Sequence, residues 1–204
     1  MTTSQSSSFT PTDLTHLRRT IALAAEALEA GDAPFGSVLV GGSSGDSSGN
    51  NIDSSIININ SNSNINNNNN MLREDRNRTT TLNDGTRHPE FELARWAAAN
   101  MTSGARAAAT VYTSGEHCAM CAAAHAYVGL GRVVYAASAE QLVGWMAEFR
   151  REKGEEEEEE EEEERKVSVA SLPIRAVAPR VEVRGPVPEL ESEIKALHRR
   201  YAGL

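Results

Sequence analysis

One histidine and two cysteines place the strongest constraint on how this chain folds. His88 stands in the segment Thr-Arg-His-Pro-Glu, and Cys118 and Cys121 follow about thirty positions later as Cys-Ala-Met-Cys. One imidazole and two thiolates make three zinc ligands, and a catalytic zinc ion keeps its fourth position for water, whereas a structural zinc ion usually takes four protein ligands. The fold must therefore bring two distant segments of the chain to one ion.

Glu90 lies two residues after His88, close enough to exchange protons with a water molecule on the metal without binding the metal itself. This arrangement indicates hydrolytic chemistry. Taken singly, a Cys-x-x-Cys pair is also found in redox proteins, and a His-x-Glu pair carries little information. Together, each at the start of an Ala-rich helical stretch, they favour a metal site because the positive end of a helix dipole stabilises thiolates.

Two more histidines lie near the cysteines. His117 directly precedes Cys118, and binding the same ion from there needs awkward geometry, so we expect it to pack or hydrogen-bond at the rim of the pocket. His125 follows Cys121 by four residues on the same helix face, from which it can in principle reach the metal. We expect instead an interior histidine satisfied by hydrogen bonds.

The composition predicts a single domain. The 204 residues are enough for one core, and both cysteines are used in the motif, which leaves no disulfide framework. Residues 1–9 are Ser- and Thr-rich, without the apolar core of a secretion signal or the arginines of a transit peptide, and are expected to be a disordered tail. We find no apolar run long enough to cross a membrane. A cytoplasmic or nucleocytoplasmic protein is therefore predicted.

Two low-complexity segments are predicted to be solvated insertions, at residues 41–70, which are rich in Ser and Asn, and at residues 152–166, which contain the unbroken Glu run 155–164. Neither composition buries enough apolar surface to offset the entropy of ordering it. The formal net charge is −9, but the ten glutamates of the run account for more than all of it, so the rest of the chain is close to neutral.

The remaining segments alternate between helical and strand patterns. The patterns predict helices over 11–31, 91–100, 117–128, 140–150 and 188–201, and strands over 35–40, 71–75, 109–113, 132–137 and 180–184. The first helix begins with a capping box and Pro11 at its first position, and Pro89 suits the same position of the second. The first two strands are expected to form a hairpin, and the crossover helix between the last two strands predicts that they pair in parallel.

These motifs resemble the zinc-dependent cytidine/deoxycytidylate deaminase-like superfamily, in which a His-x-Glu motif precedes a Pro-Cys-x-x-Cys motif. The chain departs from that pattern at His117, which replaces the proline, and at Pro89, where many members have alanine. The likeness extends from about residue 10 onward, outside the two insertions. Segments 32–36, 75–78 and 113–116 look most like the branch that contains guanine, nucleoside and tRNA adenosine deaminases.

The resemblance implies a three-layer α/β/α fold with a central five-stranded mixed sheet, in one deaminase domain over residues 10–204. It implies one Zn²⁺ per chain, held by His88, Cys118 and Cys121, with Glu90 as the catalytic proton carrier. It also implies that Asn77 contacts the substrate base, although a turn residue at the end of a strand is the alternative for this position. Dimers or larger assemblies are usual in the superfamily, so a homo-oligomer is expected.

The implied reaction is hydrolytic removal of an exocyclic amine from a nucleobase or nucleoside, with release of ammonia. Guanine or guanosine is favoured because the near-neutral body lacks the clustered basic face that a polyanion requires. Deamination of adenosine in tRNA and deamination of cytosine or cytidine remain as alternatives. A short basic patch on the last helix favours RNA: Lys195, His198, Arg199 and Arg200.

Two hypotheses without catalysis also remain. The first is a catalytically dead deaminase-like subunit that supports an active partner, but a structural zinc site has no need of Glu90. The second hypothesis is a zinc-stabilised binding module that uses the Glu run on a basic partner. An open three-ligand site argues against this hypothesis.

Overall fold

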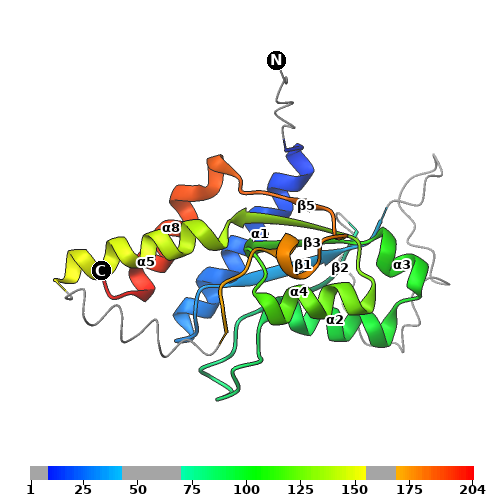
Figure 1. The fold of residues 1–204 in the computed structure, drawn as a ribbon, viewed down its shortest axis with the longest axis horizontal. Coiled ribbons are helices and arrows are strands. Elements are labelled where there is room, and N and C mark those ends of the chain that lie inside the picture. Colours follow the sequence, from blue (N-terminus) through cyan, green and yellow to red (C-terminus); the bar gives the residue numbers. More distant parts are fainter. Residues whose placement is uncertain (1–8, 43–69, 155–168) are drawn as a thin grey trace.

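The computed structural model describes residues 9–42, 70–154 and 169–204 (Figure 1). Residues 1–8 of the predicted N-terminal tail and most of both predicted insertions lie outside these residues. Phe9, the last residue of the predicted tail, packs against the core. Residues 152 and 153, placed in the second insertion from the sequence, belong to the end of a helix. Within the described part of the chain, no helix has the length and apolar character needed to cross a membrane.

A single five-stranded mixed sheet organises the fold. Its strands are β1 (Gly36–Val40), β2 (Met71–Arg76), β3 (Thr110–Gly115), β4 (Arg132–Ala137) and β5 (Val183–Arg184). They lie side by side in the order β2-β1-β3-β4-β5. β1 pairs antiparallel with β2 and with β3, whereas β3, β4 and β5 run parallel to one another. The predicted hairpin and the predicted parallel pairing of the last two strands are both confirmed.

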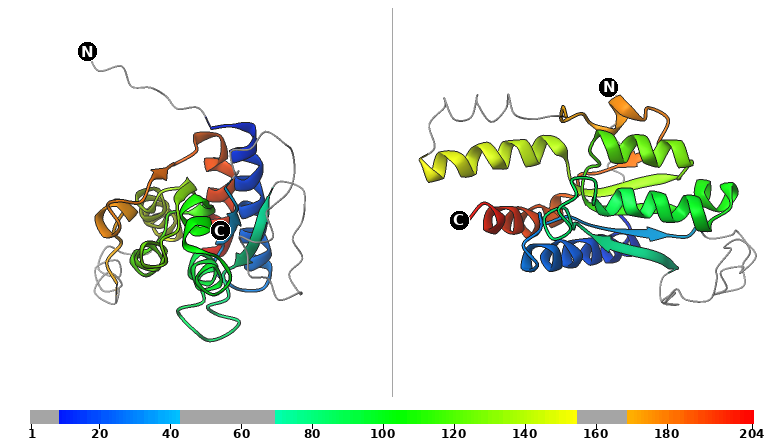
Figure 2. Two further views of the ribbon diagram at one scale, coloured as in Figure 1. Left: turned by 90° about the vertical axis from the view of Figure 1, so that its right-hand side faces the viewer. Right: turned by 90° about the horizontal axis from the view of Figure 1, so that it is seen from below.

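Helices cover both faces of the sheet, which confirms the predicted three layers (Figure 2). They are α1 (Pro11–Glu29), α2 (Pro89–Asn100), α3 (Ser103–Ala108), α4 (Ala119–Val128), α5 (Ala139–Lys153), α7 (Ile174–Val177) and α8 (Glu191–Tyr201), with a 3₁₀ turn, η1, at Pro188–Leu190. α1 and α8 lie on one face, and α2, α4 and α7 lie on the other. α5 extends beyond the sheet and packs against α8 (Figures 1 and 2).

The alternation of side chains along each strand divides the core between these two faces. On β1, Val38 packs under α1 while Leu39 packs under α2, and on β4, Val134 and Val133 divide in the same way. All five residues of β1 are buried, as expected for a strand inside a sheet that helices cover on both sides.

α1 begins as its sequence predicts. The Thr10 hydroxyl accepts a hydrogen bond from the backbone N–H of Asp13, and the Asp13 carboxylate accepts one from the backbone N–H of Thr10. The same carboxylate accepts a hydrogen bond of 2.8 Å from the Tyr112 hydroxyl on β3. This cap therefore also fixes the start of α1 against the sheet.

Several element boundaries differ from the predictions. The predicted strand over 180–184 shrinks to β5 because residues 178–181 form a turn, closed by a bond of 3.1 Å from the Val181 N–H to the Ala178 carbonyl. α3 and α7 were not predicted, since neither is long enough to show an apolar period. α4 begins at Ala119 with Cys118 as its N-cap, rather than at residue 117.

His198 on α8 provides a test of the packing between α8, α5 and the sheet. The side chain is only 3% exposed and packs against the rings of Phe35 and Trp145. Burial lowers the pKa of His198 from 6.5 to about 4. The unfolded chain therefore binds more protons than the folded protein between these two pH values, and stability is lost as the pH falls through this window.

We expect the free energy of unfolding of the wild-type protein to fall more steeply than that of His198→Gln as the pH is lowered from 6.5 to about 4. The reason is that glutamine has no proton to gain, and urea unfolding at a series of pH values measures the difference. Parallel pH profiles for the two proteins would contradict the burial of a neutral His198.

Candidate metal centre and active site

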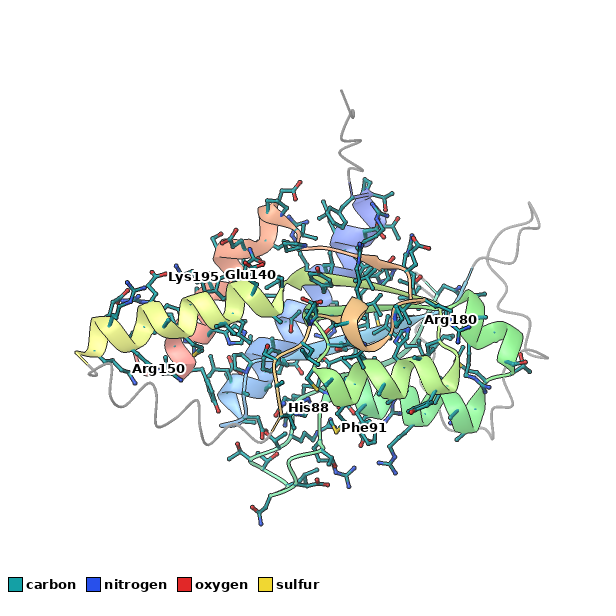
Figure 3. The ribbon with its side chains drawn as sticks, in the orientation of Figure 1. His88, Phe91, Glu140, Arg150, Arg180 and Lys195 are labelled. Atoms are coloured by element: carbon teal, nitrogen blue, oxygen red, sulfur yellow. The ribbon has the colours of Figure 1, made fainter. Side chains whose placement is uncertain are left out.

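Two helix starts bring the predicted ligands together. His88 is the N-cap of α2, and Cys118 is the N-cap of α4, with Cys121 in the first turn of α4. α2 and α4 pack side by side, so their N-termini meet at the same end of the sheet (Figure 3, with His88 labelled). The His88 side chain makes no capping hydrogen bond and is therefore available to a ligand, while Pro89 occupies the first helical position, as predicted.

The three ligand atoms have the spacing of a metal site. His88 Nδ1 lies 3.6 Å from the Sγ atoms of both Cys118 and Cys121, and all three atoms lie within 4.8 Å of one another. Tetrahedral zinc, with its usual bonds to nitrogen and sulfur, separates those two ligand atoms by about 3.5 Å. The donor set therefore fits zinc in both chemistry and spacing. No other cluster of this kind occurs in the described ranges.

The electrostatics of the cluster favour a thiolate. Hydrogen bonds from the Cys121 thiol, from His88 and from the Cys121 backbone N–H lower the pKa of Cys118 to about 4. The bond to Cys118, burial and the neighbouring Glu90 raise the pKa of Cys121. The bond to Cys118 also raises the pKa of His88. One of the two cysteines is thus held in the charged form that metals bind.

Glu90, the second residue of α2, faces the cluster without belonging to it. The side chain is 6% exposed, and its two oxygens have different partners. Oε1 accepts a hydrogen bond of 2.8 Å from the Thr113 hydroxyl, and Oε2 accepts one of 3.6 Å from the Cys121 thiol. Burial raises the pKa of Glu90, although the charge of His88 opposes the shift. A carboxyl group thus stands beside the ligands, shielded from solvent.

Asn77 follows β2 directly and is buried. Its Oδ1 accepts hydrogen bonds from the backbone N–H and the hydroxyl of Thr79, and its own backbone N–H donates to the Phe35 carbonyl. Asn77 therefore forms a turn at the end of β2, which was the alternative role predicted for this position. In this orientation Nδ2 remains as the amide atom for a further partner.

His117 packs against a neighbour, as expected, but it is buried in the interior rather than placed at the rim of a pocket. Its side chain is 1% exposed, and neither ring nitrogen has a hydrogen-bond partner among the described residues. The ring packs edge-on against His125, because residue 117 turns inward just before α4 begins. The ligand cluster includes neither histidine. His125 is an interior residue as expected, and its Nε2 lies 2.8 Å from the Gly131 carbonyl oxygen.

Asp32, at the turn before β1, holds the segment that carries Asn77 and His88. Its fully buried carboxylate accepts hydrogen bonds from the backbone N–H groups of Thr80 and Thr81, from the Thr81 hydroxyl and from Arg76. Burial alone would raise the pKa of Asp32, but these hydrogen bonds lower it. The sequence pointed to Asp32 only as part of a matching segment, since its partners lie more than forty residues away.

Two arginines, one just before α2 and one within it, form ion pairs with neighbouring carboxylates. Arg87 pairs with Asp84 and with Glu92, which also pairs with Arg95. Ion pairs and burial also lower the charge that the basic patch predicted on the last helix presents to solvent. There the ion pairs are Lys195–Glu148 and Arg199–Glu152, and His198 is buried.

A cavity of about 720 Å³ lies at the other end of α4 from the ligands. Its lining includes the Ala-rich end of α3, Leu130 and Gly131 after α4, and residues 177–182. It contains no described cluster of potential metal ligands. The candidate metal site therefore lies at the helix starts and not in this cavity.

Fold and site together define a deaminase of the cytidine deaminase-like superfamily. The model of the MafB19-like deaminase family matches residues 12–161, which is most of the chain. The protein therefore belongs to the MafB19-like deaminase family. No curated protein matches it in sequence.

Solved structures of deaminases are similar to this one. A guanine deaminase from Nitrosomonas europaea has a TM-score of 0.56 and 14% identity, and the match covers 100% of this chain and 99% of that one. This likeness shows the shared fold. A guanine deaminase from Bacillus subtilis is 30% identical over 62% of this chain and 65% of that one, with a TM-score of 0.43. A tRNA:A34 deaminase is 27% identical over 62% of this chain and 78% of that one, with a TM-score of 0.42.

We expect the purified protein to carry one metal ion per chain and the variants Cys118→Ala and Cys121→Ala to lose it, because each removes one of three ligands. Elemental analysis of the folded proteins measures this. His125→Ala is the matched control and should keep the ion, since His125 bonds to Gly131 instead. Full metal content in either cysteine variant would contradict the assignment.

Proposed function

We propose that the protein is a zinc-dependent hydrolytic deaminase that removes an exocyclic amine from a nucleobase or nucleoside of the guanine or guanosine type. The observation that carries the proposal is the three-ligand cluster with a buried carboxyl group beside it. Three protein ligands leave the position for water that a catalytic zinc ion uses. A purely structural site would have no need of Glu90.

The ligands proposed for zinc are His88 Nδ1 and the thiolates of Cys118 and Cys121. When bound, zinc lowers the pKa of a water molecule toward neutrality. The chain itself supplies the thiolate at the start of α4 and the shielding of the site from bulk solvent.

Glu90 is proposed to move the protons of the reaction. Its Oε1 is held by Thr113, so Oε2, on the side of Cys121, is the oxygen that faces the reacting atoms. From there Oε2 takes a proton from the attacking water and delivers it to a ring nitrogen of the base. It then takes the proton of the hydroxyl group formed on the ring carbon and delivers it to the amino group, which leaves as ammonia. One carboxyl group thus acts first as a base and then as an acid.

The charge of the described surface supports a small substrate. RNA binding draws most of its affinity from unpaired basic groups that contact phosphates. Here Arg87, Arg95, Lys195 and Arg199 all have carboxylate partners. A free base or nucleoside needs no such face. Asn77 is proposed to bind the base through Nδ2, the amide atom that Thr79 leaves available.

Other expectations from the sequence stay predictions. They include a homo-oligomer and a cytoplasmic location. The binding module that uses the Glu run on a basic partner falls outside the described residues. An inactive supporting subunit is disfavoured by the buried carboxyl group beside the ligand cluster.

We expect Glu90→Gln to retain its metal and fold but to lose turnover by about 10²–10⁴-fold, because the amide keeps the size of the side chain and cannot carry the proton. Steady-state kinetics together with elemental analysis separate these effects. Near-normal turnover in this variant would overturn the proposed mechanism.

The substrate prediction is tested by measuring ammonia release from a panel of free bases, nucleosides and nucleotides. We expect guanine or guanosine to be deaminated most efficiently. A tRNA anticodon stem-loop is the matched polyanionic substrate, assayed for inosine at moderate salt. Efficient inosine formation without ammonia release from any small compound would identify a tRNA adenosine deaminase instead.

A further inference from the structure

Two buried hydroxyl groups outside the ligand cluster are linked to the proposed proton carrier, one directly and one through the other. Thr113 on β3 and Ser37 on β1 are both 0% exposed. We infer that Thr113 is a positioning residue that holds the Glu90 carboxylate in its working orientation, and that Ser37 fixes the direction of the Thr113 hydroxyl. The inference rests on the proposed function, because it assigns these residues a part in the same reaction.

The sheet places the two hydroxyls together. Ser37 and Thr113 are direct partners in the antiparallel register of β1 and β3, so their side chains project from the same face. Leu39 and Val111, two residues further along the strands, lie on that face and pack in the cluster under α2. Glu90 at the start of α2 accepts a hydrogen bond from the Thr113 hydroxyl. The strand pairing and the helix start thus bring these three side chains together.

The hydrogen bonds form a relay with one direction. Ser37 Oγ donates to Thr113 Oγ1 at 2.9 Å, and Thr113 Oγ1 donates to Glu90 Oε1 at 2.8 Å. A hydroxyl group has a single hydrogen to donate. Because Ser37 supplies a donor to Thr113, the Thr113 hydrogen is directed at the carboxylate. Oε1 is thereby held, and Oε2 is directed toward the cluster.

A bound metal ion would increase the importance of Thr113. The other side chain that donates to Glu90 is the Cys121 thiol, through a longer contact of 3.6 Å. A cysteine that ligates a metal is a thiolate and has no hydrogen to donate. Among the described side chains, Thr113 is then the remaining hydrogen-bond donor to this carboxylate. Its loss would leave the carboxylate free to rotate about its side-chain torsions.

The test compares Thr113→Val, which keeps the shape of the side chain without its hydroxyl, with Thr113→Ser, which keeps the hydroxyl. We expect the valine variant to lower kcat by about ten- to a hundredfold, the range of a hydrogen bond to a charged group, with KM nearly unchanged and the metal retained. The serine variant should recover most of the activity. Equal loss in the two variants, or unchanged kcat in the valine variant, would overturn the inference.

Ser37→Ala tests the relay without altering Thr113, and so remains informative if Thr113→Val fails to fold. We expect a smaller decrease of kcat, of several-fold, with metal content and melting temperature close to wild type, because the Thr113 hydroxyl remains but can turn away. Unchanged kcat in Ser37→Ala would contradict the role of Ser37. Loss of metal from the folded variant would indicate a structural role instead and would also count against the inference.

A readout independent of activity separates this inference from the proposed function. The free energy of unfolding of Thr113→Val, Glu90→Ala and the double variant forms a double-mutant cycle. We expect the two changes to be non-additive because the two side chains share one buried hydrogen bond. Inactivity of the wild-type enzyme on every substrate would defeat the proposed function alone, whereas additive effects would defeat the positioning contact.

Discussion

The packing of α2 against α4, with both N-termini at the same end of the sheet, is the constraint on which the site depends. His88 and Cys118 are N-cap residues of these two helices, and Cys121 follows within the first turn of α4. A rotation or slip of either helix would separate ligand atoms that now lie within 4.8 Å of one another. The cores beneath these helices, around Leu93 and around Ala122, therefore preserve the chemistry as well as the fold.

Around this point the protein buries polar groups that a core normally excludes. Glu90, Thr113 and Ser37 lie inside the sheet–helix interface, and each has a hydrogen-bond partner. A satisfied polar network in a low-dielectric interior fixes orientation strongly, and the same network is costly when one member is lost. Asp32 follows the same principle at the turn before β1, where its carboxylate accepts four hydrogen bonds and orders the segment before α2.

The ion pairs at the surface show which basic side chains are available to a binding partner, which the formal charge does not. Read from the sequence, the last helix presents a basic patch, but Lys195 and Arg199 are paired with Glu148 and Glu152 of α5. Arg199 and Lys195 also lie over the Phe149 ring, which ties these cations to the packing of α5 on α8. The patch thus holds two helices together.

The local sequence determined the start of α1, the order of strands and main helices, and the three candidate ligands, because capping residues, side-chain periods and ligand types are short-range properties. It could not show that β5 ends after two residues, or that His117 turns inward beside His125, since both depend on neighbours distant in sequence. The partners of Asp32 and the Ser37–Thr113–Glu90 relay were equally hidden, because a hydroxyl or carboxylate acquires its role from the group opposite it. Only the register of β1 on β3 and the seating of α2 above them decided those contacts.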